Sequence, residues 1–193
     1  MQASGQEEPG SSPPIPFLTN LIATGFYSGY IPWASGTFGT VVGILIYLIP
    51  GAEYPPVLVS LTVLGFFVGV VTSSKVAGIV GHRLTRSAAL AKAAFQPGQH
   101  DTADPSIVVI DEIVGIWTTL LFVPKSPAAI IIAFLSFRAF DIIKTPPARQ
   151  LERIPRGWGI MLDDVFAGIY ANISTEIALL IIRSYFPSLL PHG

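Results

Sequence analysis

The feature that most constrains this chain is a series of long apolar runs with almost no charge inside them. These runs predict helices over residues 36–49, 57–72 (extending as far as 80), 107–123, 128–143 and 160–182. Hydrophobic residues make up 51% of the 193 residues and charged residues only 12%, about half the charged share of soluble domains. The sequence therefore predicts an all-α, polytopic membrane helix bundle with about four to five membrane helices.

The first of these runs is too short for a complete span. Fourteen residues at 36–49 extend ~21 Å as an α-helix, whereas the hydrocarbon core of a bilayer is ~30 Å thick. We therefore expect this helix to be short or re-entrant. The preceding segment, residues 17–31, mixes apolar and small polar residues without charge, and we expect it to lie in the membrane interface or to pack on the bundle.

Most of the chain is expected to form one domain. Residues 1–16 predict a disordered N-terminal tail, residues 17–186 a membrane-embedded domain, and residues 187–193 a short C-terminal tail. A net charge of −1 and a pI near 6.3 argue against the basic surface that nucleic-acid binding requires. The chain has no cysteine, which excludes disulfides and thiolate metal sites, and nothing in it indicates an obligate protein partner.

The few charged residues gather at the ends of the apolar runs, most densely between Ser136 and Gly168. A charged side chain at membrane depth costs at least ~2.5–3.5 kcal/mol on insertion scales, so such groups are usually paired, line a polar cavity or are functional. Three of the predicted helices bring acids to one end of the bundle. The charged residues concerned are Asp111, Glu112, Arg138, Asp141, Lys144, Asp163 and Asp164.

Basic residues predict which side of the membrane this end faces. The long connections at 82–104 and 144–158 carry seven Lys or Arg residues, whereas the turn at 51–56 has none and the turn before residue 128 has only Lys125. Because basic residues are retained on the cytoplasmic side, both connections and the acids beside them are expected to face the cytoplasm. We expect 82–104 to be a solvent-exposed loop or short helix and 144–158 to be a loop.

The acids at this end outnumber the cations, which indicates a divalent metal ion. Only oxygen ligands are available, so the expected ion is Mg²⁺, with Mn²⁺ as a substitute. Adjacent acids on a helix point about 100° apart, so one acid of each pair is expected to face the ion. The structural alternative is a buried salt bridge between Arg138 and Asp141 that fixes a helix pair. The carboxyl groups from which the ligands of this ion would come are those of Asp111, Glu112, Asp141, Asp163 and Asp164.

Basic groups beside such a site indicate a phosphate. Arg138 can hold phosphate oxygens with two parallel hydrogen bonds, and Lys144 can act as a point charge. At the predicted start of the first helix, the backbone of Gly36 and the hydroxyls of Thr37 and Thr40 can also hold a phosphate. Magnesium and phosphate at headgroup level fit an enzyme whose partner is a phospholipid substrate in the membrane.

The alternative for this glycine-rich start is close helix packing. Gly39 and Gly43 are four residues apart and make a face of small residues that lets another helix approach. The sequence alone leaves both interpretations open.

These residues together resemble the phosphatidylglycerophosphatase A family of bacterial membrane lipid phosphatases. The resemblance covers nearly the whole chain, from about Phe17 to Ile182. The family usually has Pro at the positions of Ser35 and Thr145 and Gly at that of Arg156, departures that leave every ionisable group in place. The blocks that carry the resemblance, in the family's order and at similar spacing, are Gly36–Thr40, Asp104–Gly115, Phe137–Lys144 and Gly157–Gly168.

The resemblance implies magnesium-dependent removal of the terminal phosphate from phosphatidylglycerophosphate, giving phosphatidylglycerol and inorganic phosphate. It implies a multi-pass protein of the bacterial cytoplasmic (inner) membrane whose active site faces the cytoplasm. Direct attack by water and a phospho-aspartate intermediate both stay open. The implied roles are metal binding or water activation for Glu112, Asp141, Asp163 and Asp164, and phosphate binding for Arg138, Lys144 and Thr37.

Two other functions fit parts of the pattern. A small membrane transporter or ion pathway would also carry intramembrane acids, but transport sites favour the bilayer midplane and these acids lie near helix ends. An alcohol phosphotransferase of phospholipid synthesis would carry aspartates one turn apart after an Asp-Gly pair. No such run is present, because Asp163 and Asp164 are adjacent.

Overall fold

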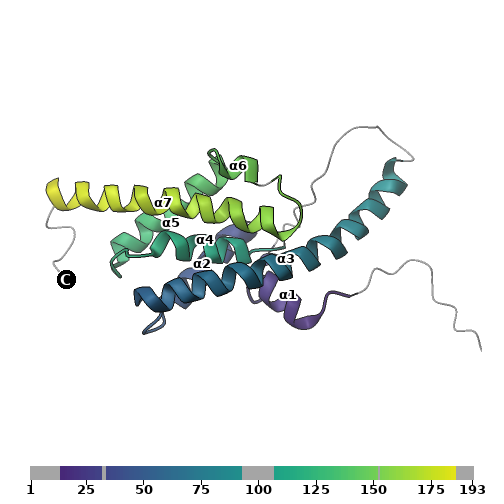
Figure 1. Ribbon diagram of the computed structural model, residues 1–193, viewed down its shortest axis with the longest axis horizontal. Helices are drawn as coiled ribbons and strands as arrows, with labels where there is room; N and C mark the ends of the chain where they lie inside the picture. The colour runs from purple at the N-terminus through teal and green to yellow at the C-terminus, as the bar shows by residue number, and fades with distance from the viewer. Residues whose placement is uncertain (1–13, 32–33, 93–106, 152, 186–193) are drawn as a thin grey trace, which may run out of the picture.

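The computed structural model describes residues 14–31, 34–92, 107–151 and 153–185, with the backbone alone for 80–92. All regular structure within these residues is helical, as predicted (Figure 1). Of the predicted tails, residues 1–13 and 187–193 lie outside the described residues. The elements are α1 (Phe17–Ala23), the 3-10 turn η1 (Ser28–Tyr30), α2 (Ser35–Leu48), α3 (Pro55–Lys92), α4 (Ile110–Leu120), α5 (Pro127–Ile143), α6 (Ala148–Leu151) and α7 (Gly157–Tyr185).

Within the described residues, two helices are long and apolar enough to cross a membrane. An 18-residue window within the 25 residues Pro55–Ile79 of α3 has a mean hydropathy of 2.1, and one within the 29 residues of α7 has a mean hydropathy of 1.8. The 14-residue α2 is a shorter apolar helix, as expected for this segment. Large apolar side chains such as Leu64 on α3 and Leu180 on α7 point away from the protein. These features confirm the predicted helical membrane bundle.

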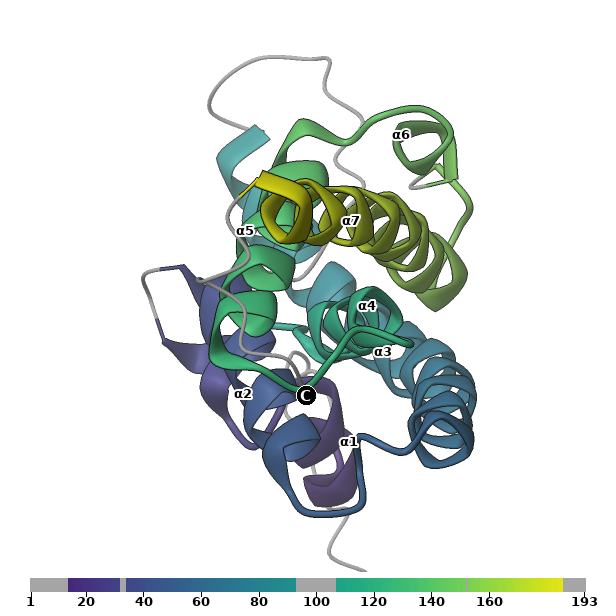
Figure 2. The ribbon, with the colours of Figure 1, turned by 90° about the vertical axis from the view of Figure 1, so that its left-hand side faces the viewer.

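The short helix α4 is the centre of this bundle. All of its residues except Glu112 are buried, and it packs against α2, α3, α5 and α7. The view along the bundle shows α4 among these helices (Figure 2). Its 11 residues extend only ~16 Å, too short to cross a bilayer. The apolar run predicted as a membrane helix over 107–123 is therefore a core helix that other helices shield.

Glycines let α2 approach α4 closely. A Cβ on Gly43 would lie 2.5 Å from the side chain of Ile116, and one on Gly39 would lie 2.7 Å from Cβ of Val109. No other residue type fits at such a separation without moving one of the helices. The packing role predicted for Gly39 and Gly43 is confirmed.

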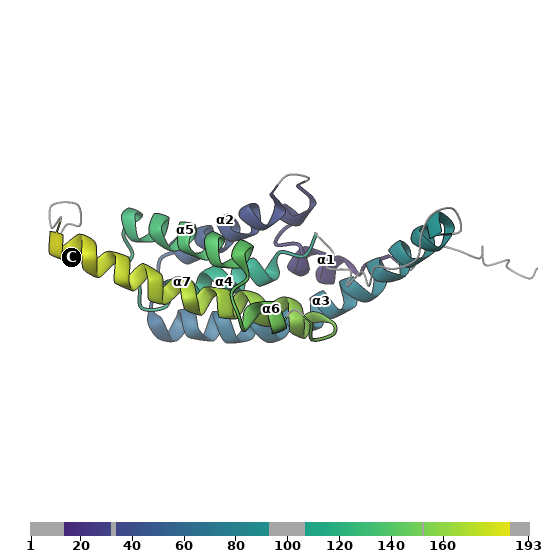
Figure 3. The same cartoon turned by 90° about the horizontal axis from the view of Figure 1, so that it is seen from above.

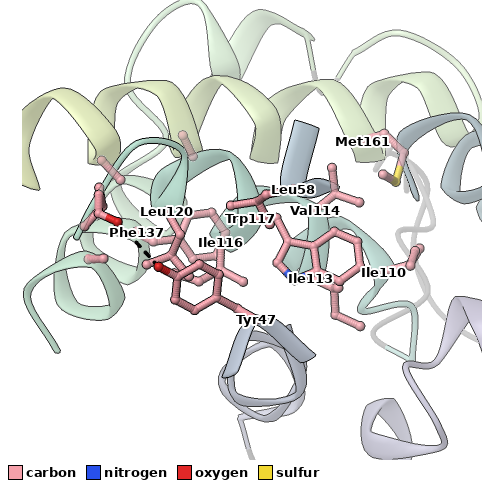
Figure 4. Packing of buried hydrophobic residues seen from close by; sticks show 14 of the residues in the cluster. Tyr47, Leu58, Ile110, Ile113, Val114, Ile116, Trp117, Leu120, Phe137 and Met161 are labelled. Atoms are coloured by element: carbon pink, nitrogen blue, oxygen red, sulfur yellow. Dashed lines mark hydrogen bonds between the residues drawn. The ribbon is translucent and has the colours of Figure 1, made fainter. Parts of the chain in front are cut away.

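Hydrogen bonds from Tyr47 and Trp117, whose side chains lie in the core shown in Figure 4, tie the helices together. Trp117 Nε1 donates to the carbonyl of Gly43 at 2.9 Å, and the hydroxyl of Tyr47 donates to the carbonyl of Val123 at 3.4 Å. Because little water reaches an apolar bundle, polar side chains buried there need partners within the protein. These bonds fix α4 against α2 and fix the end of α2 against the segment that follows α4.

Two predicted connections contain more helix than expected. The segment 82–92, expected to be a loop or short helix, continues α3, which extends beyond the rest of the bundle (Figure 3). Its Ala, Leu, Arg and Lys residues have high helix propensity, so charge there does not interrupt the helix. The connection 144–158, predicted as a loop, contains the short helix α6, and α7 begins at Gly157.

Candidate active site

The acidic end of the bundle is built where α4 crosses α7. A Cβ on Gly168 of α7 would lie 2.5 Å from the carbonyl oxygen of Gly115 on α4, so the two backbones meet at these glycines. Asp111 precedes Gly115 by four residues, and Asp164 precedes Gly168 by four. Each acid thus lies one helical turn before the contact. Both helices run away from this end of the bundle, so the crossing brings the two carboxyl groups together.

Asp111, Glu112 and Asp164 form a cluster that we call the acidic triad. One carboxylate oxygen from each residue lies within 4.8 Å of the other two. Asp164 is only 3% exposed and Asp111 9%. With an effective dielectric constant of ~20, two unit charges 4.8 Å apart repel by about 3.5 kcal/mol. Three ionised carboxyls this close therefore require a cation or added protons.

Oxygen atoms of the acidic triad are available to a ligand. Glu112 Oε2 and Asp164 Oδ2 are buried and have no hydrogen-bond partner among the described residues. A buried polar atom without a partner costs about 1–3 kcal/mol, and a charged one costs more. All the donors are carboxylate oxygens, which hard divalent cations such as Mg²⁺ prefer. The chemistry of the donor set therefore fits such an ion.

Among the described residues, two cations beside the acidic triad form ion pairs. Arg138 Nη1 lies 2.5 Å from Asp141 Oδ2 within α5, and Lys144 Nζ lies 3.2 Å from Asp163 Oδ2 on α7. Asp141 is also a charged neighbour of two acids of the triad. The salt bridge considered for Arg138 and Asp141 is present, but it joins residues of one helix and cannot fix a helix pair. The pair of Lys144 and Asp163 does join α5 to α7.

The N-terminus of α2 borders the same site. A Cβ on Gly36 would collide with Glu112 Oε1 and lie 3.1 Å from Arg138 Nη1, so only glycine leaves both side chains in place. Thr37 is half-buried beside it. Thr40 is fully buried, and its hydroxyl donates to the carbonyl of Gly36 at 2.8 Å. Gly36 therefore lies in the site, whereas the hydroxyl of Thr40 is engaged within α2.

The two adjacent pairs of acids contribute differently to the acidic triad. Asp164 belongs to the triad and Asp163 pairs with Lys144, as expected for side chains about 100° apart. Asp111 and Glu112 both belong to the triad, contrary to the expectation for this pair. The side chain of Glu112 is one methylene longer than that of Asp111. Its carboxyl group can therefore come close to the carboxyl groups of Asp111 and Asp164, although the two side chains leave α4 in different directions.

Several residues that position these acids escaped the sequence analysis. Gly115 and Gly168 set the crossing of α4 and α7. Ser74 of α3 accepts a hydrogen bond from the N–H of Gly157 at 2.9 Å and so holds the start of α7. The signal for the glycines is the shared pattern Asp-x-x-x-Gly on both helices. A glycine one turn after an acid indicates a close helix contact directly beside that acid.

Comparison with known proteins places this site in a family. The family described as Phosphatidylglycerophosphatase A matches residues 21–179 of the chain. The chain belongs to this family. Membership confirms the resemblance found in the four sequence blocks, and it confirms the predicted class of enzyme, a phosphatase.

Named relatives match over most of their length. Phosphatidylglycerophosphatase A of Haemophilus influenzae is 33% identical over 160 residues, which is 80% of this chain and 84% of that protein. The Escherichia coli protein of the same name is 31% identical over 156 residues, 78% of this chain and 77% of that protein. A Bacteroides thetaiotaomicron protein named as a candidate phosphatidylinositol-3-phosphatase is 35% identical over 170 residues, 84% of this chain and 94% of that protein. No solved structure matches the chain significantly.

The structure gives a physical reason for one departure from the family pattern. Arg156 is exposed just before α7, and its φ of 66° is left-handed. Glycine adopts this conformation without strain, whereas the Cβ of other residues crowds the backbone. The glycine that the family usually has at this position therefore suits the backbone better than arginine does.

Proposed function

We propose that this protein removes the terminal phosphate of phosphatidylglycerophosphate in a magnesium-dependent reaction that gives phosphatidylglycerol and inorganic phosphate. The observation that carries the proposal is the acidic triad beside two cations at one end of an apolar helical bundle. The family and the two relatives named Phosphatidylglycerophosphatase A support this substrate. A site at the end of a membrane-associated bundle suits a lipid whose phosphate lies at headgroup level.

The acidic triad is the proposed magnesium site. Glu112 Oε2 and Asp164 Oδ2 support this assignment because they are buried without a hydrogen-bond partner in the described part of the chain. Asp111 supplies the third carboxylate. Asp141 and Asp163 pair with cations, so their role is to orient those cations beside the triad. When bound, magnesium supplies positive charge against the phosphate oxygens and makes the phosphorus more open to attack.

Arg138 and Lys144 are the proposed phosphate ligands. The guanidinium of Arg138 lies over Gly36, with Nη2 3.3 Å from where a Cβ at that position would be. Asp141 holds one nitrogen of the guanidinium, and further N–H groups of its fork can bind phosphate oxygens. The Lys144 side chain is 30% exposed and adds a point charge that a phosphate can reach.

In the proposed reaction, the oxygen of a water molecule bonds to phosphorus and the bond from phosphorus to the glycerol oxygen breaks. The glycerol oxygen takes up a proton. Carboxylate oxygens of the acidic triad can accept the proton of the attacking water. The guanidinium and the ammonium stabilise the charge that spreads over the phosphate oxygens, and burial of the carboxyls strengthens these interactions. An aspartyl-phosphate route leads to the same products.

We infer that the protein is a multi-pass protein of the cytoplasmic membrane whose site faces the cytoplasm. Exposed apolar side chains cover the outer faces of α2, α3, α5 and α7. Basic residues are more frequent at the end that holds the site, which supports this orientation. Basic residues with described side chains at this end are Lys75, Arg138, Lys144, Arg149, Arg153 and Arg156, and those at the other end are Lys125 and Arg183.

The relative named as a candidate phosphatidylinositol-3-phosphatase supports a second substrate for the same chemistry, an inositol lipid phosphomonoester. Purified protein with magnesium is given phosphatidylglycerophosphate, phosphatidylinositol 3-phosphate, phosphatidic acid or glycerol 3-phosphate in parallel, and phosphate release is measured. We expect the highest kcat/KM with phosphatidylglycerophosphate, and loss of release in Asp164→Asn. A clear preference for phosphatidylinositol 3-phosphate would replace the first substrate with the second. No release from any of the four compounds would refute both.

A further inference from the structure

Helix α5 ends at a lysine in a conformation that glycine usually adopts. Lys144 is left-handed (φ 48°, ψ 65°), and its N–H donates to the carbonyl of Phe140 at 2.9 Å. A Cβ strains this conformation, which is why glycine is the common residue after the last turn of a helix. Strained residues of this kind gather at functional sites and persist only where the surrounding structure holds them. Contacts from neighbouring residues must therefore hold the backbone of Lys144 in this conformation.

Tyr170 of α7 makes such contacts on both sides of Lys144 in the sequence. Its hydroxyl donates to the carbonyl of Pro146 at 2.9 Å, and its ring packs on the ring of Phe140 at a centroid distance of 5.7 Å. Tyr170 follows Asp163 by seven residues, so both lie on one face of α7, two turns apart. One face of α7 thus holds both the backbone around Lys144 and the ammonium of Lys144.

We propose that Tyr170 is a positioning residue of the site, which holds the turn of residues 144–146 so that Lys144 Nζ stays beside Asp163 Oδ2. The role toward phosphate rests on the proposed function, whereas the positioning itself is a property of the folded chain. Without the hydroxyl, the turn can leave the left-handed conformation. Lys144 Nζ, at the end of a side chain that is 30% exposed, then moves away from Asp163 toward solvent.

The chain supplies a matched control at the opposite end of the bundle. Lys125 is also ion-paired, to Glu53 at 3.1 Å, and its side chain is 28% exposed. The hydroxyl of Tyr47 donates to a backbone carbonyl there, that of Val123, as the hydroxyl of Tyr170 does to Pro146. Both ends of the bundle therefore have an ion-paired lysine and a tyrosine whose hydroxyl donates to a backbone carbonyl, but the proposed site lies at only one of them.

The test compares the wild type, Tyr170→Phe and Tyr47→Phe in detergent without substrate. The lysines are acylated with a limiting amount of a water-soluble amine reagent, and the rates at Lys144 and Lys125 are followed by mass spectrometry of peptides. Loss of one hydrogen bond is expected to raise the rate at Lys144 roughly threefold to tenfold in Tyr170→Phe, with Lys125 unchanged. Tyr47→Phe is expected to leave the rate at Lys144 unchanged. An unchanged Lys144 rate in Tyr170→Phe overturns the proposal.

Kinetics and unfolding complete the test. We expect Tyr170→Phe to lower kcat/KM for phosphatidylglycerophosphate by a similar factor, roughly threefold to tenfold, and Tyr47→Phe to leave it unchanged. A purely structural role would lower the unfolding temperature of both variants alike without changing the Lys144 rate. If the wild type releases no phosphate, the proposed function fails, while the acylation rates still decide the role of Tyr170.

Discussion

Replacement of Gly36 by alanine is expected to disturb the active site without destabilising the hydrophobic core. The added Cβ would collide with Glu112 Oε1 and lie 3.1 and 3.3 Å from the two Nη atoms of Arg138. Both contacts are ends of long side chains, which can move aside at little cost to folding. Alanine also has a helix propensity higher than that of glycine by about 1 kcal/mol. We therefore expect an unfolding temperature equal to or above that of the wild type.

The same movement should be costly for catalysis. A displacement of ~1 Å among catalytic groups lowers the rate about 100-fold, which corresponds to about 2.7 kcal/mol of transition-state stabilisation. We expect kcat/KM for phosphatidylglycerophosphate to fall by about this factor in Gly36→Ala. The assay is phosphate release by purified protein with magnesium, beside thermal unfolding of the same preparation.

Gly39→Ala is the matched control three residues further along α2. Its Cβ would lie 2.7 Å from Cβ of Val109 and 3.1 Å from the carbonyl oxygen of Val109, and both atoms are fixed by the packing of α4. Overpacking of this kind costs about 1–3 kcal/mol of stability. We expect a lower unfolding temperature with kcat/KM preserved in the folded fraction. Near wild-type kcat/KM in Gly36→Ala, or an equal loss in Gly39→Ala, would refute the reasoning.

Three other perturbations test the ion pair, the strained backbone and the orientation. Exchange of Arg138 and Asp141 keeps a salt bridge but places a carboxylate against the phosphate. Phosphate release should therefore fall roughly 100- to 1,000-fold, while the unfolding temperature stays near that of the wild type. Near wild-type turnover would mean that the pair has a structural role only. Arg156→Gly removes left-handed strain and should stabilise the protein by about 0.5–1 kcal/mol in thermal unfolding, and a destabilised variant would contradict this. Gln150 is exposed at the end that holds the site, and Tyr54 is 62% exposed at the other end of a chain without cysteine. A membrane-impermeant thiol reagent should label Tyr54→Cys in intact cells and Gln150→Cys only in inverted vesicles, and the reverse pattern would overturn the orientation.

The meeting of the acids could be predicted because charge marks the ends of the apolar runs. Asp111 and Asp164 lie toward the starts of their helices and Asp141 toward the end of its helix, so the connectivity of the chain brings them to one end. The composition of the triad could not be predicted in this way. It depends on the crossing of α4 and α7, which is set by Gly115 and Gly168 through backbone contact rather than through any charged group.

The central position of α4 within the bundle also could not be predicted from the sequence. Beyond its first turn α4 carries no charge, and an uncharged apolar helix is favoured in lipid and in a protein core alike, so its composition does not distinguish the two. The decisive feature lies in α2, where Gly39 and Gly43 admit a neighbouring helix at short distance. The segment 82–92 shows a different limit, because its charged residues led us to expect a loop or short helix and did not indicate that α3 continues through them.

The central claim is that the acidic triad holds a magnesium ion that hydrolysis requires. The most direct measurement is phosphate release from phosphatidylglycerophosphate by purified protein in excess chelator, followed by addition of Mg²⁺ or Zn²⁺. Because the proposed ligands are all carboxylates, activity should vanish in chelator and return with Mg²⁺ but not with Zn²⁺. Full activity in excess chelator would contradict the account.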